Sequence, residues 1–189
     1  MSNPPDQDLV RRSLRGDRAA FGELVERHQR RVYNLCLRML GRPDDAADAT
    51  QDVFLTALRK LSGFRGAAAL STWLHRIAVN TCYDALRKRS REVLAEEPLP
   101  EPPPSPDPSG AADARIDVQR ALMEVPEDFR AVLVLHDVAG LPYEEVAEIL
   151  GAPVGTVKSR LHRGRVALAR VLRGEQPDPP RPSNLQENR

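Results

Sequence analysis

Residues 141–165 read LPYEEVAEILGAPVGTVKSRLHRGR, and they decide the fold of the C-terminal half. Apolar residues recur at helical spacing on both sides of Gly151, which predicts helices over 142–150 and 153–172. Gly151 permits a sharp turn that a side chain would obstruct, and Pro153 suits the first turn of a helix. The expected inward-facing residues are Val146, Ala147, Ile149, Leu150, Val154, Val157 and Leu161. The stretch therefore predicts a helix-turn-helix.

The outward face of the second helix carries hydroxyls, bases and one imidazole. Residues 153–173 contain six bases and no acid. Such side chains suit phosphates and base edges in a DNA major groove. The alternative is an ordinary helical hairpin with a solvated basic face, but the uncompensated bases and the turn chemistry favour a DNA-reading helix. The candidate DNA-binding residues are Thr156, Lys158, Ser159, Arg160, His162, Arg163 and Arg165.

Most of the remaining chain is also expected to be helical, which gives an all-α fold. In the N-terminal half, apolar periodicity predicts helices over residues 6–15, 17–40, 43–61 and 71–89. In the C-terminal half, further helices are expected over 113–124 and 126–140. For the helix 43–61, the predicted core stripe is Ala47, Thr50, Phe54, Ala57, Leu58 and Leu61.

A proline-rich segment separates the two halves. Residues 92–114 contain seven prolines, six acids and no base, a composition that disfavours regular structure. We therefore expect two small helical domains joined by a flexible acidic linker, with a disordered tail at the end. The expected divisions are a first domain at 1–91, the linker at 92–112, a second domain at 113–173 and the tail at 174–189.

The helix after Ser71 has a second face beside its apolar core face. This face combines aromatic rings, cations and an amide, which suits single-stranded nucleic acid. Phe64 and Arg65 in the preceding glycine-containing loop add to it. The alternative is that its aromatic residues are half-buried at a domain boundary. The candidate residues on this face are Trp73, Arg76, Asn80, Tyr83 and Arg87.

One face of the helix 43–61 is acidic but includes an apolar residue. Charged helical faces are usually only solvated, yet Leu55 would lie exposed among carboxylates, which indicates a protein partner. A metal site is disfavoured because the face offers no loop geometry and no histidine. The candidate partner-binding residues are Asp44, Asp45, Asp48, Gln51, Asp52 and Leu55.

The overall composition restricts the remaining functions. The net charge is only +1, because acidic and basic residues occur in separate blocks. Cys36 and Cys82 lie in apolar stretches and are read as reduced core thiols, with a disulfide or redox pair as the alternative. No catalytic set, zinc spacing or phosphate loop occurs, so we expect no catalytic residues, metal or cofactor. Without a membrane-length apolar run or a signal peptide, the protein is expected to be cytoplasmic.

The combined motifs resemble a sigma factor of the extracytoplasmic-function (ECF) group of the sigma-70 family. The segments that carry the resemblance are DDAADATQDVF at 44–54, FRG at 64–66, STWLHRIAVN at 71–80 and the helix-turn-helix at 141–165. By this resemblance, the first domain is similar to sigma domain two and the second to sigma domain four. The alanines after Phe64-Arg65-Gly66 depart from the polar or acidic residue common in the family.

The resemblance implies a function and partners. The acidic helix would dock on the clamp helices of core RNA polymerase, and domain four would also contact the polymerase flap. Phe64, Arg65 and the aromatic–basic face would recognise and melt the promoter −10 element through its non-template strand. The second helix of the helix-turn-helix would read the −35 element in duplex DNA. An anti-sigma factor is a further implied partner.

Two other classes remain as alternatives. A stand-alone repressor or activator would bind duplex DNA tightly without polymerase, usually as a dimer. A helical adaptor would bind only protein and show no salt-dependent DNA binding. An enzyme is a more distant alternative, because no catalytic constellation is evident.

Overall fold

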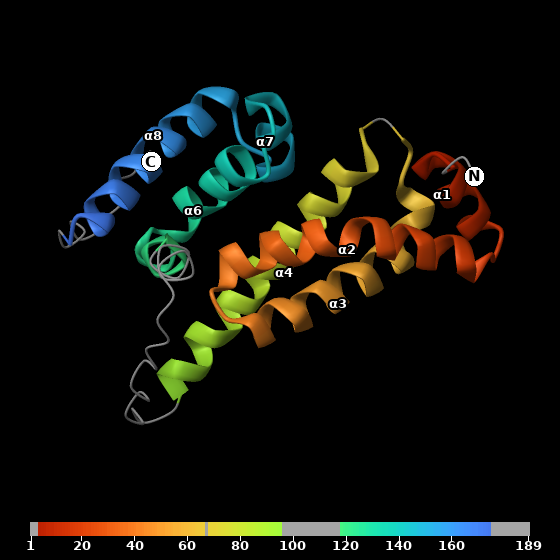
Figure 1. Ribbon diagram of the computed structural model, residues 1–189, viewed down its shortest axis with the longest axis horizontal. Coiled ribbons are helices and arrows are strands. Elements are labelled where there is room, and N and C mark those ends of the chain that lie inside the picture. Colours follow the sequence, from red (N-terminus) through yellow and green to blue (C-terminus); the bar gives the residue numbers. More distant parts are fainter. Residues whose placement is uncertain (1–3, 67, 96–117, 175–189) are drawn as a thin grey trace, which may run out of the picture.

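The computed structural model describes residues 4–66, 68–95 and 118–174, which form helices without any β-strand (Figure 1). The all-α prediction is thereby confirmed. The first four helices are α1 (Asp6–Leu14), α2 (Arg18–Leu40), α3 (Pro43–Lys60) and α4 (Leu70–Ala95), with a 3-10 turn η1 (Leu61–Gly63) before α4. The later elements are α6 (Glu127–Leu133), a π-helical turn η2 (Val134–Val138), α7 (Tyr143–Leu150) and α8 (Val154–Leu172). Residues 118–124 are also helical.

The first four helices form one bundle, in which α2 packs against α1, α3 and α4. Local sequence sets the ends of α2: the Asp17 carboxylate accepts a hydrogen bond from the Ala20 backbone N–H (3.1 Å), and Gly41 ends the helix in the left-handed conformation. Pro43 then occupies the first turn of α3, where a missing N–H costs nothing. These short-range signals explain why sequence periodicity located the helices to within a residue or two at most ends.

The core stripe predicted for α3 is partly wrong. Ala47 is exposed and Leu58 is 50% exposed, whereas Ala46, Ala49 and Val53 are buried. Each of these three buried residues lies one position before an expected one, because alanines occur on several sides of this helix and give its apolar stripe no clear edge. Leu58 therefore lies close to Leu55 on the exposed surface, and Leu55 is 55% exposed as expected.

The C-terminal domain contains the predicted helix-turn-helix. Gly151 has a φ of 60° and ends α7 in the left-handed region, where a β-carbon would be strained. Val157 and Leu161 of α8 are buried, which confirms their inward assignment. α8 also packs across α6 at Gly164, where an added β-carbon would lie only 3.0 Å from Leu133 Cγ.

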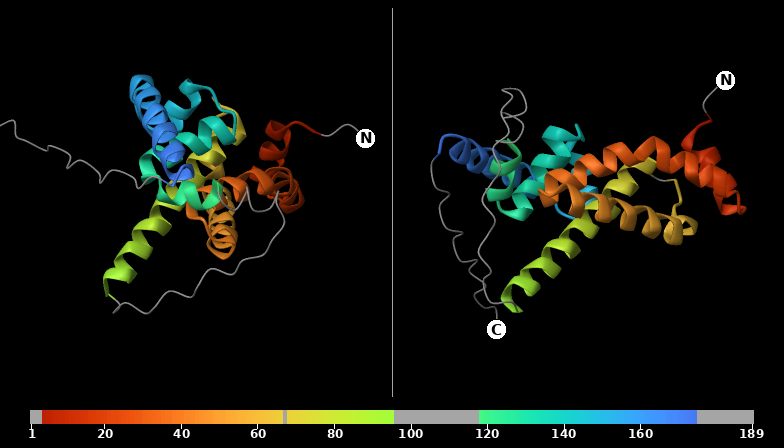
Figure 2. Two further views of the ribbon diagram at one scale, coloured as in Figure 1. Left: turned by 60° about the vertical axis from the view of Figure 1, so that its left-hand side comes forward. Right: turned by 60° about the horizontal axis from the view of Figure 1, so that its bottom comes forward.

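Helix α4 continues beyond its predicted end at residue 89 and ends at Ala95. The first four residues of the expected linker, 92–95, are therefore helical. The end of α4 extends away from both domains (Figure 2). Three expected segments lie outside the described residues: the rest of the linker, the start of the next helix at 113–117, and the tail at 175–189.

The two domains pack against one another at two places. α7 packs on the N-terminal half of α4, and α6 with η2 packs near the C-terminal end of α2 (Figures 1 and 2). At the end of α2, Gln119 Nε2 donates to the Leu37 carbonyl (2.9 Å) and Arg130 Nη1 donates to the Met39 carbonyl (2.6 Å). The Leu37 carbonyl also accepts a hydrogen bond from the Gly41 N–H that caps α2 (2.9 Å). Arg130 thus gives the Met39 carbonyl a partner at the helix end, where the last carbonyls lack one within the helix.

His75 in α4 makes stability depend on pH. Its side chain is buried and its Nδ1 has no hydrogen-bond partner in the described structure. Burial, with the nearby charges of His28 and Arg31, lowers the pKa of His75 to about 4. Because the unfolded residue titrates near its ordinary value, the unfolded state binds more protons between these two pKa values. The stabilisation is complete above pH ~6.5 and is lost as the pH falls towards 4.

We therefore expect the free energy of unfolding to fall between pH 7 and pH 5, with His75 contributing about 2 kcal/mol of the loss. Urea denaturation at pH 7 and at pH 5 measures this change in the free energy of unfolding. His75→Leu should remove this share of the pH dependence, whereas the matched change at exposed His162 should not. An unchanged pH profile in the His75 variant would assign the effect to other groups.

Candidate functional site

The predicted DNA-binding residues of α8 divide into an outer group and a flanking group. Arg160 makes an ion pair with Asp128 of α6 (3.1 Å) and Arg165 with Asp137 of η2 (2.6 Å), and both pairs lie within the C-terminal domain. The pairing also raises the pKa of Arg165, so this side chain stays charged. These two arginines therefore help to hold α8 on its neighbours.

The outer group lies opposite the buried Val157 and Leu161. It contains Ser159, His162 and Arg163, which are all exposed. Lys158 is on the side, with its ammonium 5.3 Å from the centre of the Tyr143 ring. Thr156 is half-buried, and its backbone carbonyl accepts a hydrogen bond from the Ser159 hydroxyl (2.9 Å). The arrangement provides a protruding polar surface held on a rigid apolar base.

The loop and the aromatic–basic face of α4 come together as expected. The Phe64 and Trp73 rings are tilted at 48° with centres 5.3 Å apart, and both are half-buried. Arg65, Asn80 and Arg87 are exposed. Arg87 pairs with Asp84, one turn earlier on the same helix. The two half-buried rings contact one another, and the exposed Arg65 follows Phe64 directly in the loop. Aromatic rings together with cations are the chemistry that single-strand-binding proteins use.

The C-terminal domain covers part of this same face. Arg76 Nη2 donates to the Glu148 backbone carbonyl (2.6 Å) and lies 3.3 Å from the Glu148 carboxylate. The Tyr83 hydroxyl lies 3.5 Å from Asp128 Oδ1. Burial, with the charge of Asp128, raises the pKa of Tyr83 to about 12. The alternative interpretation, that the aromatic residues lie at a domain boundary, is therefore correct for Tyr83 in this arrangement.

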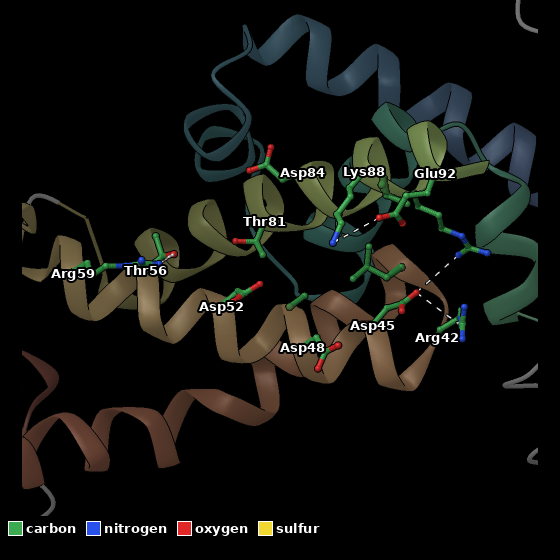
Figure 3. A pocket seen from close by; sticks show the side chains of 15 residues that line it. Arg42, Asp45, Asp48, Asp52, Thr56, Arg59, Thr81, Asp84, Lys88 and Glu92 are labelled. Atoms are coloured by element: carbon green, nitrogen blue, oxygen red, sulfur yellow. Dashed lines mark hydrogen bonds and ion pairs between the residues drawn. The ribbon is translucent and has the colours of Figure 1, made fainter. Parts of the chain in front are cut away.

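The acidic face of α3 borders a cleft of about 670 Å³ between α3 and α4 (Figure 3). Asp45 lies 3.9 Å from Arg42 and 4.0 Å from Arg89 across the cleft. Within the described residues, Asp48 and Asp52 form no ion pair, so their exposed charges are available to a partner. Asp44, Gln51 and Leu55 are exposed on the same helix.

Sequence reasoning missed several residues of this cleft. Outside the cleft, on the exposed surface of α3, Leu58 adds a second exposed apolar side chain beside Leu55. Lys88 and Arg89 of α4 lie across from the acids of α3, as Figure 3 shows for Lys88. A signal for this pairing was present, because the acidic block at 43–52 and the basic block at 85–91 have opposite charge. Periodicity alone does not show that two such helices are neighbours.

No metal or thiolate chemistry is evident in the described part of the chain. It contains no group of three or more His, Cys, Asp or Glu side chains placed to hold a metal ion. Cys36 and Cys82 are free and buried, and they share a hydrogen bond. That hydrogen bond and burial raise the pKa of the Cys82 thiol, so it stays protonated. Among the described helices, none is both long and apolar enough to cross a membrane.

Comparisons with known proteins identify the family. Residues 24–92 match the family Sigma-70 region 2, and residues 115–168 match Sigma-70 region 4. The chain is 42% identical to the ECF RNA polymerase sigma factor SigM of Mycobacterium tuberculosis, over 88% of this chain and 84% of that protein. It is 39% identical to the ECF RNA polymerase sigma-E factor of Escherichia coli K12, over 86% of this chain and 92% of that protein.

Solved structures agree with this relationship. The sigma factor RpoE of Bartonella quintana, solved with its anti-sigma factor NepR, is similar with a TM-score of 0.68 and 29% identity. That match covers 82% of this chain and 96% of RpoE. CnrH, solved with the cytosolic domain of CnrY, gives a TM-score of 0.67 and 27% identity, over 89% of this chain and 97% of CnrH.

The two domains, with their helix-turn-helix and charged surfaces, define a helical transcription factor. The chain belongs to the ECF group of RNA polymerase sigma factors. Sigma factors are non-catalytic initiation factors, and the family binds core RNA polymerase and promoter DNA. Membership therefore implies promoter-directed transcription initiation.

Proposed function

We propose that this chain recognises the −35 and −10 elements of its promoters with separate surfaces, and melts the −10 element while bound to core RNA polymerase. The observation that carries the proposal is the presence of two chemically different surfaces on separate helical domains. One is the protruding polar face of α8, and the other is the Phe64–Trp73 ring pair beside α4.

For the −35 element, α8 enters the major groove with its exposed outer residues towards the bases. The exposed positions of Ser159, His162 and Arg163 support this orientation. Each well-made contact to a base edge discriminates by about 1–3 kcal/mol. Thr156 and Lys158 complete the reading surface, while Arg160 and Arg165 contribute mainly by fixing α8, with their positive charge still near the phosphates.

For the −10 element, the non-template strand is captured as it unpairs. Flipping a base out of the duplex costs a few kcal/mol, and stacking on an aromatic ring returns roughly 1–3 kcal/mol. Phe64 and Trp73 supply the rings, and Arg65, Arg76 and Asn80 supply charge and hydrogen bonds. Tyr83 and Arg87 extend the surface along α4 when it is accessible.

For core polymerase, the acidic face of α3 docks on the clamp helices and domain four contacts the flap. The exposed carboxylates of Asp44, Asp48 and Asp52 support this role, together with the exposed Leu55. Asp45 and Gln51 belong to the same face. The proposed site of action is the cytoplasm. An anti-sigma factor is the proposed regulator, since RpoE of Bartonella quintana was solved with one.

Reconstitution with core RNA polymerase tests the proposal. We expect the holoenzyme to start transcription at promoters selected from a random library and to make −10 thymines reactive to permanganate. Arg163→Ala should reduce transcription from promoters with a −35 element by roughly ten- to a hundredfold, as expected for one lost base contact.

The matched control is Arg18→Ala, which removes an exposed arginine of α2 outside every proposed surface. It corrects for the loss of general attraction to DNA. Equal activity of the Arg163 variant and the control would contradict the −35 assignment. A holoenzyme that starts no transcription from any selected promoter would contradict the proposal as a whole.

A further inference from the structure

Helix α1 joins the bundle to the element from which the Phe64 loop starts. The helix precedes the residues that match Sigma-70 region 2, which begin at residue 24, and no surface proposed for polymerase or DNA includes it. Leu9 and Val10 of α1 are buried in the same apolar cluster as Leu61 of η1. α1 packs on α2 and also contacts η1, at the end of the bundle where Figure 1 places both. The helix therefore touches the base of the loop as well as the bundle.

One carboxylate ties the start of α1 to α2. Asp6 Oδ2 lies 2.8 Å from His28 Nε2, and Asp6 Oδ1 accepts a hydrogen bond from Arg27 Nη1 (3.1 Å). The same Arg27 nitrogen donates to the Pro4 backbone carbonyl (2.6 Å). The side chains of His28 and Arg27 are only 7% and 19% exposed, so water and salt screen these contacts less than they screen a surface ion pair.

The shape of α1 depends on this docking. The helix has only nine residues, and helices of that length are marginal in water unless they pack on the rest of a protein. Apart from the buried Leu9 and Val10, the contacts of Asp6 are what hold its first turn on α2. Loss of the Asp6 carboxylate should therefore loosen α1 where it meets η1.

η1 connects α1 to the two aromatic rings of the candidate −10 site. Leu61 of η1 is only 3% exposed, and its backbone carbonyl accepts a hydrogen bond from the Phe64 N–H (3.0 Å). The Phe64 ring in turn contacts Trp73, with 5.3 Å between the ring centres. A shift of η1 would thus move Phe64 relative to Trp73.

We propose that α1 is a brace for the loop at residues 64–66, and that Asp6 is the positioning residue that keeps this brace docked. The proposal rests on the proposed function of Phe64 at the −10 element. A loop that is held in place before the strand arrives binds it without a further ordering cost. Asp6 thus acts on promoter opening through Phe64, without contacting DNA itself.

The fluorescence of Trp73, the only tryptophan in the sequence, reports the position of the loop in the free, full-length protein. In Asp6→Ala, acrylamide should quench Trp73 more efficiently, towards the value of Phe64→Ala, in which the neighbouring ring is missing. Asp6→Asn keeps one acceptor oxygen and should give an intermediate value. Circular dichroism checks that the variants fold, and Asp6→Asn carries the test if Asp6→Ala does not.

The matched control is Asp8→Ala, which removes an equal charge from the same first turn of α1. Asp8 pairs with Arg11 of its own helix, so its loss should leave the quenching of Trp73 near the wild-type value. Equal quenching in the Asp6 variants and this control would overturn the brace.

The same variants in the holoenzyme test the effect on DNA. Asp6→Ala should slow the appearance of permanganate-reactive −10 thymines by about tenfold, as expected for the loss of one charge-assisted hydrogen bond. Affinity for core polymerase and dependence on the −35 element should stay at the level of Asp8→Ala. A comparable loss of polymerase affinity in Asp6→Ala would overturn its role as a positioning residue for the loop.

Phe64→Ala in the holoenzyme separates this inference from the proposed function. If Phe64→Ala opens promoters poorly while Asp6→Ala opens them normally despite increased quenching, the role of the brace in promoter opening is overturned. If Phe64→Ala itself opens promoters normally, the −10 assignment of the loop is wrong. The quenching of Trp73 then still decides whether α1 holds the loop.

Discussion

Core RNA polymerase is expected to lose its affinity for the Asp48→Arg variant by roughly a hundredfold or more, because like charges placed together in an interface cost several kcal/mol. Asp48 lies exposed beside the cleft between α3 and α4 and forms no ion pair in the described structure (Figure 3). Its replacement should therefore leave the fold intact while reversing the charge presented to the partner. Titration of labelled core polymerase with wild type and variant measures the change.

The matched control is Glu26→Arg, an equal charge reversal at an exposed position of α2 outside the acidic face. It should bind polymerase within about twofold of the wild type, since a distant surface charge contributes little across a Debye length of about 8 Å. Circular dichroism and thermal unfolding check that both variants fold. Equal binding by the Asp48 variant and the control would remove α3 from the polymerase interface.

Leu55 and Leu58 add an exposed apolar contact to the acidic surface of α3. Both are at least half exposed, and Leu58 was assigned to the core by periodicity. An apolar pair beside carboxylates is typical of a surface that a partner covers. The error in sequence reasoning therefore had a physical origin: a helix with alanines on several sides fits more than one apolar stripe, and burial is decided by which neighbours pack on it.

Local signals predicted the helices well, but contacts between distant segments could not be read from the sequence. Gly41, Pro43 and Gly151 mark helix ends through backbone conformation alone. The contact between Arg76 and Glu148 depends on how two domains pack, and no spacing encodes it. In the same way, Arg160 matched the pattern of a DNA-reading residue, yet its ion pair with Asp128 became visible only in three dimensions.

The crossing of α6 and α8 should be the least tolerant position of domain four. A β-carbon at Gly164 would lie 3.0 Å from Leu133 Cγ and 3.2 Å from the Phe129 backbone carbonyl. Leu133 is only 2% exposed, and a backbone oxygen moves only with its whole helix. Gly164→Val should therefore force the two helices apart and destabilise the domain by about 1–3 kcal/mol or more, despite the better helix propensity of valine.

Chemical denaturation followed by helical circular dichroism measures this loss, and Gly155→Val in the same helix is the matched control. No atom lies within 4 Å of a β-carbon at Gly155, so the identical substitution there should be neutral or slightly stabilising. Because α6 positions α8, the Gly164 variant should also lose −35-dependent transcription at temperatures where domain four unfolds. A Gly164 variant as stable as the control would mean that α6 and α8 do not cross closely, and that the α8 surface is not held on the apolar base described above.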